Sequence, residues 1–160
     1  MNLAQSPHVP AQGSKPRLAD LPWLISYGLH GLARLVIARL KFETLTAKEI
    51  PQRNQDAKIN ALDASILDPA ALARISYVMP RISDRLPWRS DCLVQAIAAQ
   101  DWLSNLGAAS EIQIGVEHPE GGKFAAHAWL MHEGQIVTGG DISQYDVILA
   151  DSQSNNDSGD

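Results

Sequence analysis

The only cysteine of this 160-residue chain stands at the expected start of a helix, in the stretch RSDCLVQAIAAQDWLSNLG. Serine is a favoured N-cap, so we place Ser90 at the cap and Cys92 in the first turn. Unpaired N–H groups and the positive end of the helix dipole favour a thiolate there, and they can also stabilise an oxyanion. Arg89 would favour the thiolate and Asp91 would oppose it. A lone cysteine is nevertheless often a small buried hydrophobe, so position alone leaves both interpretations open.

His127 is the candidate general base for that thiol. It stands in the apolar run FAAHAWLM, which we predict to be a strand with Trp129 and Met131 on the same face as His127. A histidine in such a strand can be an ordinary hydrogen-bonded core residue. It can also take the proton of Cys92 and later protonate a leaving amine, which is how a nucleophile and its base divide the work.

Asp141 is the candidate third member, because a hairpin should bring it near the imidazole. We expect a three-residue loop over residues 132–134, with Gly134 in the left-handed conformation. In that register the pairs run from Met131–Gln135 to Ala125–Asp141. Asp141 then shares the face of His127, diagonally across the strands and within reach of the ring, where a carboxylate can orient a catalytic histidine.

Other positions for the orienting acid stay open. A two-residue turn would put Asp141 on the opposite face, unless Gly139 and Gly140 form a bulge. Asp146 and Glu133 are rival acids, and Asp141 can also be a plain loop residue after a Gly-Gly turn.

The histidines do not form a metal-binding pattern. His127 and His132 lie five residues apart on a strand and its turn, so they face opposite ways. No cysteine or histidine pair, His118 included, has the spacing of a zinc site. We therefore expect no metal site.

Helices occupy the first part of the chain. Apolar residues at helical spacing predict a helix over Leu21–Phe42, capped by Asp20. The polar residues 46–64 are typical of a loop with short helical pieces. A second helix should begin after the cap Asp68 and end at Pro80.

The cysteine helix and a small sheet occupy the second part. The helix should run from about Asp91 to Leu106, with Gly107 as its stop. The apolar period then changes from 3.6 to 2, which indicates strands over residues 111–117, 124–131 and 135–139, and a fourth short one within 143–149. Helices followed by an antiparallel meander predict an α+β fold.

The chain suits one compact unit with flexible ends. We expect a disordered segment over residues 1–18, a helical region over 19–87, a core carrying the site over 88–150, and a disordered tail over 151–160.

Composition narrows the class of protein. The net charge of −5 and the pI near 5.4 argue against a nucleic-acid partner. A single cysteine gives no intrachain disulfide, and no signal peptide is recognisable. His30, Arg34 and Arg39 make Leu21–Phe42 a poor membrane span. We therefore expect a cytoplasmic protein, with Leu21–Phe42 buried or in peripheral contact with a partner.

The runs CLVQAIAAQDWLSNLGAASEIQIGV and AHAWLMHEGQIVTGGDISQYDVIL resemble a known family. They are similar to the lasso peptide leader peptidases, the stand-alone B proteins of bacterial lasso peptide biosynthesis, within the transglutaminase-like superfamily of papain-related cysteine proteases. The resemblance covers Trp88 to Leu149. It implies Cys92 as nucleophile, His127 as base and Asp141 as orienting acid, on a core whose cysteine helix packs against a small antiparallel sheet.

The resemblance also implies a reaction and partners. The enzyme would cut a ribosomal precursor between leader and core, without a cofactor, and an ATP-dependent macrolactam cyclase would then close the ring. Residues 1–87 show no run of alternating strands, so we expect leader recognition to sit on a separate small protein. The helix Leu21–Phe42 is a candidate docking face for that protein or the cyclase.

Two departures from the family pattern and two alternatives remain. Met131 stands where an acidic residue often follows, and no glutamine precedes Cys92, so the second oxyanion donor is unknown. The same triad would serve a transglutaminase-like amidase or acyl transferase acting on another substrate. The chain could also be a non-catalytic scaffold in a peptide-maturation complex, although a scaffold does not require the triad.

Overall fold

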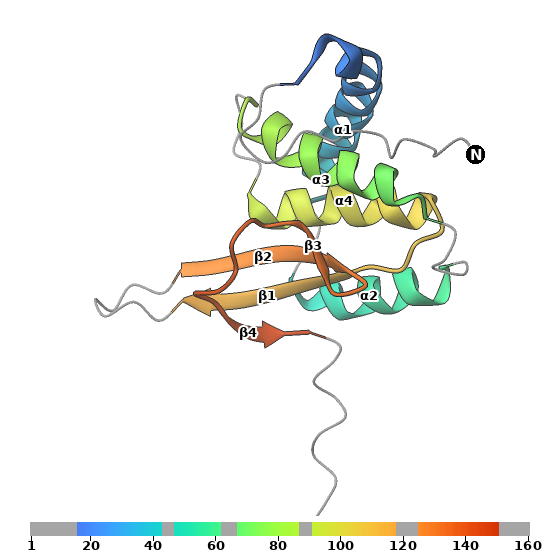
Figure 1. The fold of residues 1–160 in the computed structure, drawn as a ribbon. Coiled ribbons are helices and arrows are strands. Elements are labelled where there is room, and N and C mark those ends of the chain that lie inside the picture. Colours follow the sequence, from blue (N-terminus) through green and yellow to red (C-terminus); the bar gives the residue numbers. More distant parts are fainter. Residues whose placement is uncertain (1–15, 43–46, 62–66, 87–90, 118–124, 151–160) are drawn as a thin grey trace, which may run out of the picture.

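The structure, a computed structural model, describes residues 16–42, 47–61, 67–86, 91–117 and 125–150. Its elements in chain order are η1 (Leu18–Asp20), α1 (Leu21–Phe42), η2 (Ala47–Glu49), α2 (Ile50–Ile59), α3 (Pro69–Ser83), α4 (Cys92–Asn105), β1 (Glu111–Glu117), β2 (Ala125–His132), β3 (Gln135–Thr138) and β4 (Asp146–Leu149) (Figure 1). The predicted α+β class, with helices first and an antiparallel sheet after them, is confirmed. Most of the two segments expected to be disordered, 1–18 and 151–160, lies outside the described residues.

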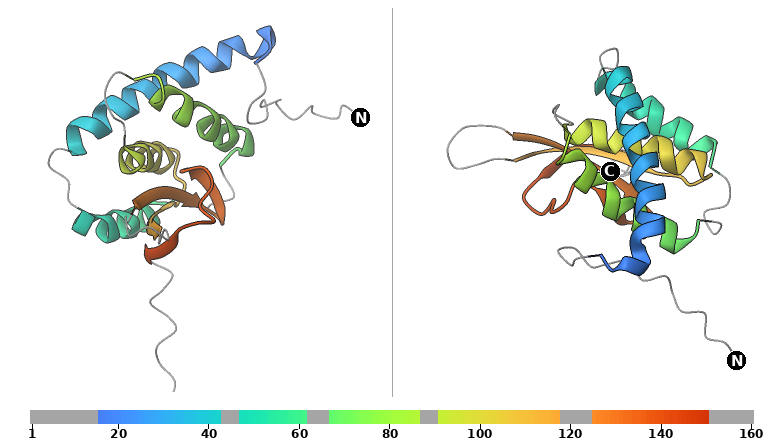
Figure 2. Two further views of the ribbon diagram at one scale, coloured as in Figure 1. Left: turned by 90° about the vertical axis from the view of Figure 1, so that its left-hand side faces the viewer. Right: turned by 90° about the horizontal axis from the view of Figure 1, so that it is seen from above.

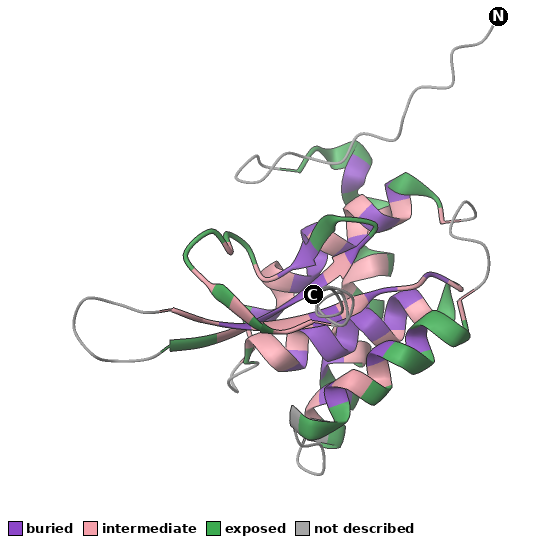
Figure 3. Cartoon of the chain, turned by 90° about the horizontal axis from the view of Figure 1, so that it is seen from below, coloured by how far each residue is buried: buried purple, intermediate pink, exposed green. Residues whose placement is uncertain are grey.

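Helix α4 is the centre of the molecule. The sheet, α1, α2 and α3 surround it (Figure 2). Most residues of α4 are buried, as expected for a helix with neighbours on several sides. Its buried residues are Val94, Ala96, Ile97, Ala98, Ala99, Gln100, Trp102 and Leu103. Burial is concentrated where helices and strands meet, and the exposed residues lie at the periphery (Figure 3).

The end of α4 is where the sequence predicted it. Gly107 has a φ of 77°, a left-handed conformation that glycine adopts without strain. The N–H of Ala108 donates to the carbonyl of Leu103 (2.9 Å) and that of Gly107 to Ser104 (3.0 Å). These two bonds form a Schellman motif and satisfy the last carbonyls of the helix.

The sheet has the strand order β3-β2-β1-β4, and its described pairs are antiparallel. The first three strands form the expected meander, whereas β4 returns to the far edge beside β1. In the β1–β2 register, Ile112 pairs with Leu130 and Gly115 with His127. Leu130 joins Leu35 of α1, Ile75 of α3 and Ile97 of α4 in one apolar cluster, so helices and sheet share a core.

Helix α1 has the predicted bounds. The helix η1 runs directly into α1, and the Asp20 carboxylate accepts from the N–H of Arg17 (2.8 Å) and from Nε1 of Trp23 (3.3 Å). By length and composition alone, Leu18–Lys41 would suffice to cross a membrane, and 17% of its apolar window is buried in the structure. One face of α1 packs on α3 and α4, and much of the rest is exposed.

Helix α3 confirms its predicted start and corrects its predicted end. The Asp68 side chain accepts from the N–H of Ala70 (3.0 Å), as an N-cap does. The helix does not stop at Pro80 but continues to Ser83. Proline removes one helical N–H, yet Ile82 packs against the core and the N–H of Asp84 donates to the Pro80 carbonyl (2.9 Å). Tertiary contacts therefore outweigh the break.

The polar residues 46–64, expected to form a loop with short helical pieces, contain a ten-residue helix, α2. Asn54 is fully buried there, and its side chain both donates to the carbonyl of Ile112 (3.0 Å) and accepts from the N–H of Ile112 (2.9 Å). Nε2 of Gln100 also donates to Asn54 (3.0 Å). Hydrogen bonds to residues far along the chain hold this helix in place. The apolar pattern of its own residues is weak, so the sequence did not predict its full length.

Candidate active site

Cys92 lies in the first turn of α4, as the sequence predicted, and is the first residue of that helix. The N-cap is Asp91, one residue later than expected, and Ser90 lies outside the described residues. The first intrahelical bond runs from the N–H of Gln95 to the Asp91 carbonyl (3.1 Å). The N–H groups of Cys92, Leu93 and Val94 precede it and have no intrahelical acceptor. The half-buried thiol therefore lies at the electropositive end of the helix.

The sheet presents His127 beside this thiol. The N–H of Ala128, the next residue along β2, donates to Sγ of Cys92 (3.4 Å). Cys92, His127 and Asp141 all line one cavity of about 490 Å³ between α3, α4 and the loop that follows β3. The structure thus brings the three predicted site residues to one place from three different elements.

A backbone carbonyl holds the imidazole. Nε2 of His127 lies 2.7 Å from the carbonyl oxygen of Gly139. A carbonyl only accepts, so Nε2 must carry the proton, and in the neutral ring Nδ1 is then the free base. The Tyr145 ring lies against the imidazole, with centroids 4.9 Å apart, and Trp129 flanks it at 6.1 Å. The ring orientation is therefore determined by Gly139 and two aromatic walls.

Asp141 lies in the cavity lining but bonds elsewhere. Its Oδ1 accepts from the N–H of Ser143 (3.0 Å), and the carboxylate is exposed. This backbone hydrogen bond, with a second from the Ser143 side chain, lowers the pKa of Asp141 below its ordinary value. Among the described hydrogen bonds, the group that meets His127 is the carbonyl of Gly139, which sequence reasoning did not identify.

The hairpin register differs from the predicted one. The turn has two residues, Glu133 with φ 46° and Gly134 with φ 76°, which matches the strongly favoured type I′ geometry. His132 therefore belongs to β2 and pairs with Gln135, and its Nδ1 lies 2.6 Å from the carbonyl of Ala109. This buried contact holds His132 in the strand, so the three-residue loop is wrong.

A bulge follows the turn. Met131 pairs with Ile136 but Leu130 pairs with Thr138, so Val137 is the extra residue. The bulge is therefore inside β3 and not at Gly139 and Gly140. A bulge bends the strand that carries it, which directs the next residues over the face of β2 that presents the imidazole.

Glu133 and Asp146, the two rival candidates for the orienting acid, occupy different positions relative to His127. Glu133 is exposed at the hairpin turn, and its Oε2 is 4.0 Å from Nε2 of His132, not of His127. Asp146 is the first residue of β4 and pairs with Val116. Asp146 directly follows Tyr145, whose ring lies against His127. Of the two rival acids, Asp146 is therefore the one whose neighbour in the chain contacts the imidazole.

Two glycines allow the aromatic wall to form. A Cβ on Gly115 would meet Trp129 at 2.7 Å, and a Cβ on Gly139 would overlap the Trp129 Cβ. Gly139 also has a φ of 116°, which other residues rarely adopt. A glycine inside a strand signals such a close approach, so the runs QIGVE and TGGD held this clue.

The cavity lining includes a buried hydroxyl. The Thr138 side chain is buried and has no hydrogen-bond partner within the described chain. Buried polar groups normally have partners, so this hydroxyl is a position where a bound peptide backbone could bond.

Within the described ranges, no group of three or more histidine, cysteine, aspartate or glutamate side chains could hold a metal ion. His118, which the sequence analysis considered, lies outside those ranges. A thiol, an imidazole and first-turn N–H groups are nevertheless the parts of nucleophilic acyl chemistry.

Comparison with known proteins gives one match. A family model described as "Transglutaminase-like superfamily" matches residues 32–150, well over half of the chain. No curated protein and no solved structure matches it.

Proposed function

The chain belongs to the transglutaminase-like superfamily, and on that premise we propose that it is a cysteine endopeptidase that removes the leader from a lasso peptide precursor. Superfamily membership supports cysteine protease or amidase chemistry. The observation that carries the proposal is the contact between Sγ of Cys92 and the strand that presents His127, inside one cavity. The leader peptidase assignment rests on the resemblance of Trp88 to Leu149 to that family.

The first half of the reaction uses both ring nitrogens. Nδ1 of His127 takes the proton of Cys92, and the thiolate attacks the carbonyl carbon of the scissile peptide bond. The oxyanion forms beside the unpaired N–H groups at the start of α4. The imidazolium then gives its proton to the leaving amine, which departs as the new N-terminus of the core peptide.

The second half releases the leader. A water molecule gives a proton to Nδ1 and attacks the thioester, and the thiol leaves with a proton returned by the ring. The Gly139 carbonyl keeps Nε2 protonated throughout and stabilises the imidazolium with its dipole, the role that a carboxylate has in a triad. Asp141 remains the proposed acid of the site, and a change of its side-chain direction would be required for it to reach the ring.

Partners and location follow from the same proposal. A small leader-recognition protein would deliver the precursor, and a cyclase would take the core peptide, in the cytoplasm. Leu29 and Leu40 of α1 are 65% and 67% exposed, and α1 carries no acidic residue, so this helix is the proposed docking face.

Mass spectrometry of a candidate precursor tests the reaction. The precursor is incubated with the chain and with its neighbouring recognition protein, and we expect a free leader and a core with a free amine. Cys92→Ala and His127→Ala should each abolish cleavage while circular dichroism stays unchanged. Cleavage by Cys92→Ala at the wild-type rate would end the peptidase proposal. Transfer of the leader acyl group to an added amine, without hydrolysis, would favour the acyl transferase.

A further inference from the structure

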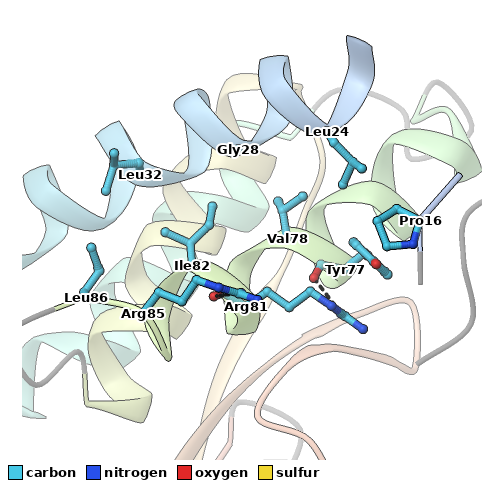
Figure 4. Close-up of a pocket in the computed structure, with 10 residues that line it drawn as sticks. All are labelled: Pro16, Leu24, Gly28, Leu32, Tyr77, Val78, Arg81, Ile82, Arg85 and Leu86. Atoms are coloured by element: carbon cyan, nitrogen blue, oxygen red, sulfur yellow. Dashed lines mark hydrogen bonds between the residues drawn. The ribbon is translucent and has the colours of Figure 1, made fainter. Parts of the chain in front are cut away.

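A second hollow lies between α1 and α3, away from the thiol. Leu24, Gly28 and Leu32 are four residues apart and share one face of α1. A Cβ at Gly28 would have no atom within 4 Å, so the missing side chain leaves open space between the two leucines. The resulting cavity of about 640 Å³, called here the α1–α3 groove, is shown in Figure 4.

Helix α3 gives the groove an apolar floor and a cationic edge. Val78 and Ile82 form the floor. Arg81 lies over the Tyr77 ring at 3.6 Å and donates from Nη1 to the Tyr77 carbonyl (2.9 Å). Nη1 of Arg85 donates to the Arg81 carbonyl (2.6 Å). Neither guanidinium bonds a carboxylate in the described part of the chain, and each has further N–H donors.

The groove and the cavity of Cys92 share α3 as a wall. At 3.6 residues per turn, Ser76 and Pro80 project from the side that lines the Cys92 cavity, and the groove residues Val78 and Ile82 project from the far side. Arg81 projects between them. A peptide that reaches both sites must pass around α3, and half the circumference of a helix about 10 Å across is about 16 Å. An extended chain covers about 3.3 Å per residue, so about five extended residues span the path.

We propose that the α1–α3 groove is a distal subsite for the peptide substrate, holding an apolar side chain of the substrate with a neighbouring carboxylate against Arg81 and Arg85. This inference rests on the proposed peptidase function. The charge of the site selects the occupant: residues 1–15, which precede the groove residue Pro16, contain no aspartate or glutamate, so they do not match two arginines. An acidic, apolar peptide matches both the floor and the edge.

Fluorescence anisotropy with synthetic peptides tests the subsite on the full chain. The probes are three labelled octapeptides of leucine and alanine that carry two glutamates, two glutamines or two lysines. The variants are Gly28→Leu, whose Cβ meets no atom within 4 Å and whose side chain extends into the groove, and Arg85→Glu, which reverses the charge of its edge. Lys48→Glu is the matched charge reversal on η2, outside the groove. Thermal unfolding verifies that each variant is folded.

The expected pattern is specific in probe and in variant. The glutamate peptide should bind at least about tenfold tighter than the glutamine peptide at low salt, because Arg–carboxylate bonds are charge-assisted. Gly28→Leu and Arg85→Glu should each weaken it by about tenfold or more, and Lys48→Glu should leave it unchanged. Equal binding of all three peptides, no saturable binding, or undiminished binding by Gly28→Leu would overturn the inference.

Processing of the precursor separates this inference from the proposed function. If the wild-type protein does not cut any precursor but binds the probes in the expected pattern, the groove is a peptide-binding site and the peptidase proposal is wrong. If Gly28→Leu cuts the precursor with the kcat/KM of wild type, the peptidase proposal is supported and the groove is not a substrate subsite.

Discussion

Two glycines of α1, three residues apart, should respond in opposite ways to alanine. A Cβ on Gly28 meets nothing within 4 Å, whereas a Cβ on Gly31 lies 2.9 Å from Cδ1 of Ile82 and 3.3 Å from the Trp102 ring. Gly31 is therefore the point where α1 closely approaches α3 and α4. The same substitution at the two positions separates helix propensity from packing.

The magnitudes follow from these contacts. Replacing a mid-helix glycine by alanine stabilises a protein by about 0.5–1 kcal/mol, and Gly28→Ala should gain this in full. In a chain of this length that raises Tm by about 1–4 °C. Gly31→Ala gains the same propensity but overpacks the contact, at a cost of about 1–3 kcal/mol. The end of Ile82 can yield, so we expect a net loss of about 0.5–2 kcal/mol.

Urea unfolding followed by tryptophan fluorescence measures both changes. Equal m-values in the two variants and wild type are the control that the unfolded states are comparable. Two variants of equal stability, or a more stable Gly31→Ala, would show that α1 does not pack on Ile82 and Trp102 as described.

The remaining predictions concern the site and its support. Asp141→Asn should reduce precursor cleavage less than loss of the thiol or the ring does, and a larger defect in Asp146→Asn would identify the other acid. Gly139→Ala should lower kcat and change the ¹⁵N tautomer signature of His127, because the new methyl group displaces the carbonyl that holds Nε2; an unchanged spectrum would contradict that contact. Asn54→Ala should cost about 2–4 kcal/mol in urea unfolding, because it leaves buried backbone groups unpaired, and a cost near zero would refute the bridge from α2 to β1. The pKa of the Asp141 carboxyl is lowered by its hydrogen bonds, so its stabilising contribution is complete above the ordinary pKa and is lost as pH falls through the lowered value; an NMR titration at or above the ordinary value would contradict this.

Local signals predicted the parts that depend on neighbouring residues. Apolar periodicity and the Gly107 stop identified α4 and placed Cys92 in its first turn, because helix ends depend on caps within a few residues. Alternation identified β1 and β2 in the same way. Local signals do not predict the position of α2, because it depends on hydrogen bonds from Asn54 to a strand far along the chain.

The sequence by itself determined the reacting groups and the elements that carry them: Cys92 at a helix start and His127 on an apolar strand. Tertiary structure alone decided what holds the ring, because a backbone carbonyl has no side-chain signature and its place depends on the turn at Glu133, the bulge at Val137 and the packing of Gly139 on Trp129. Register depends on energies summed over paired strands, which no single window of sequence contains.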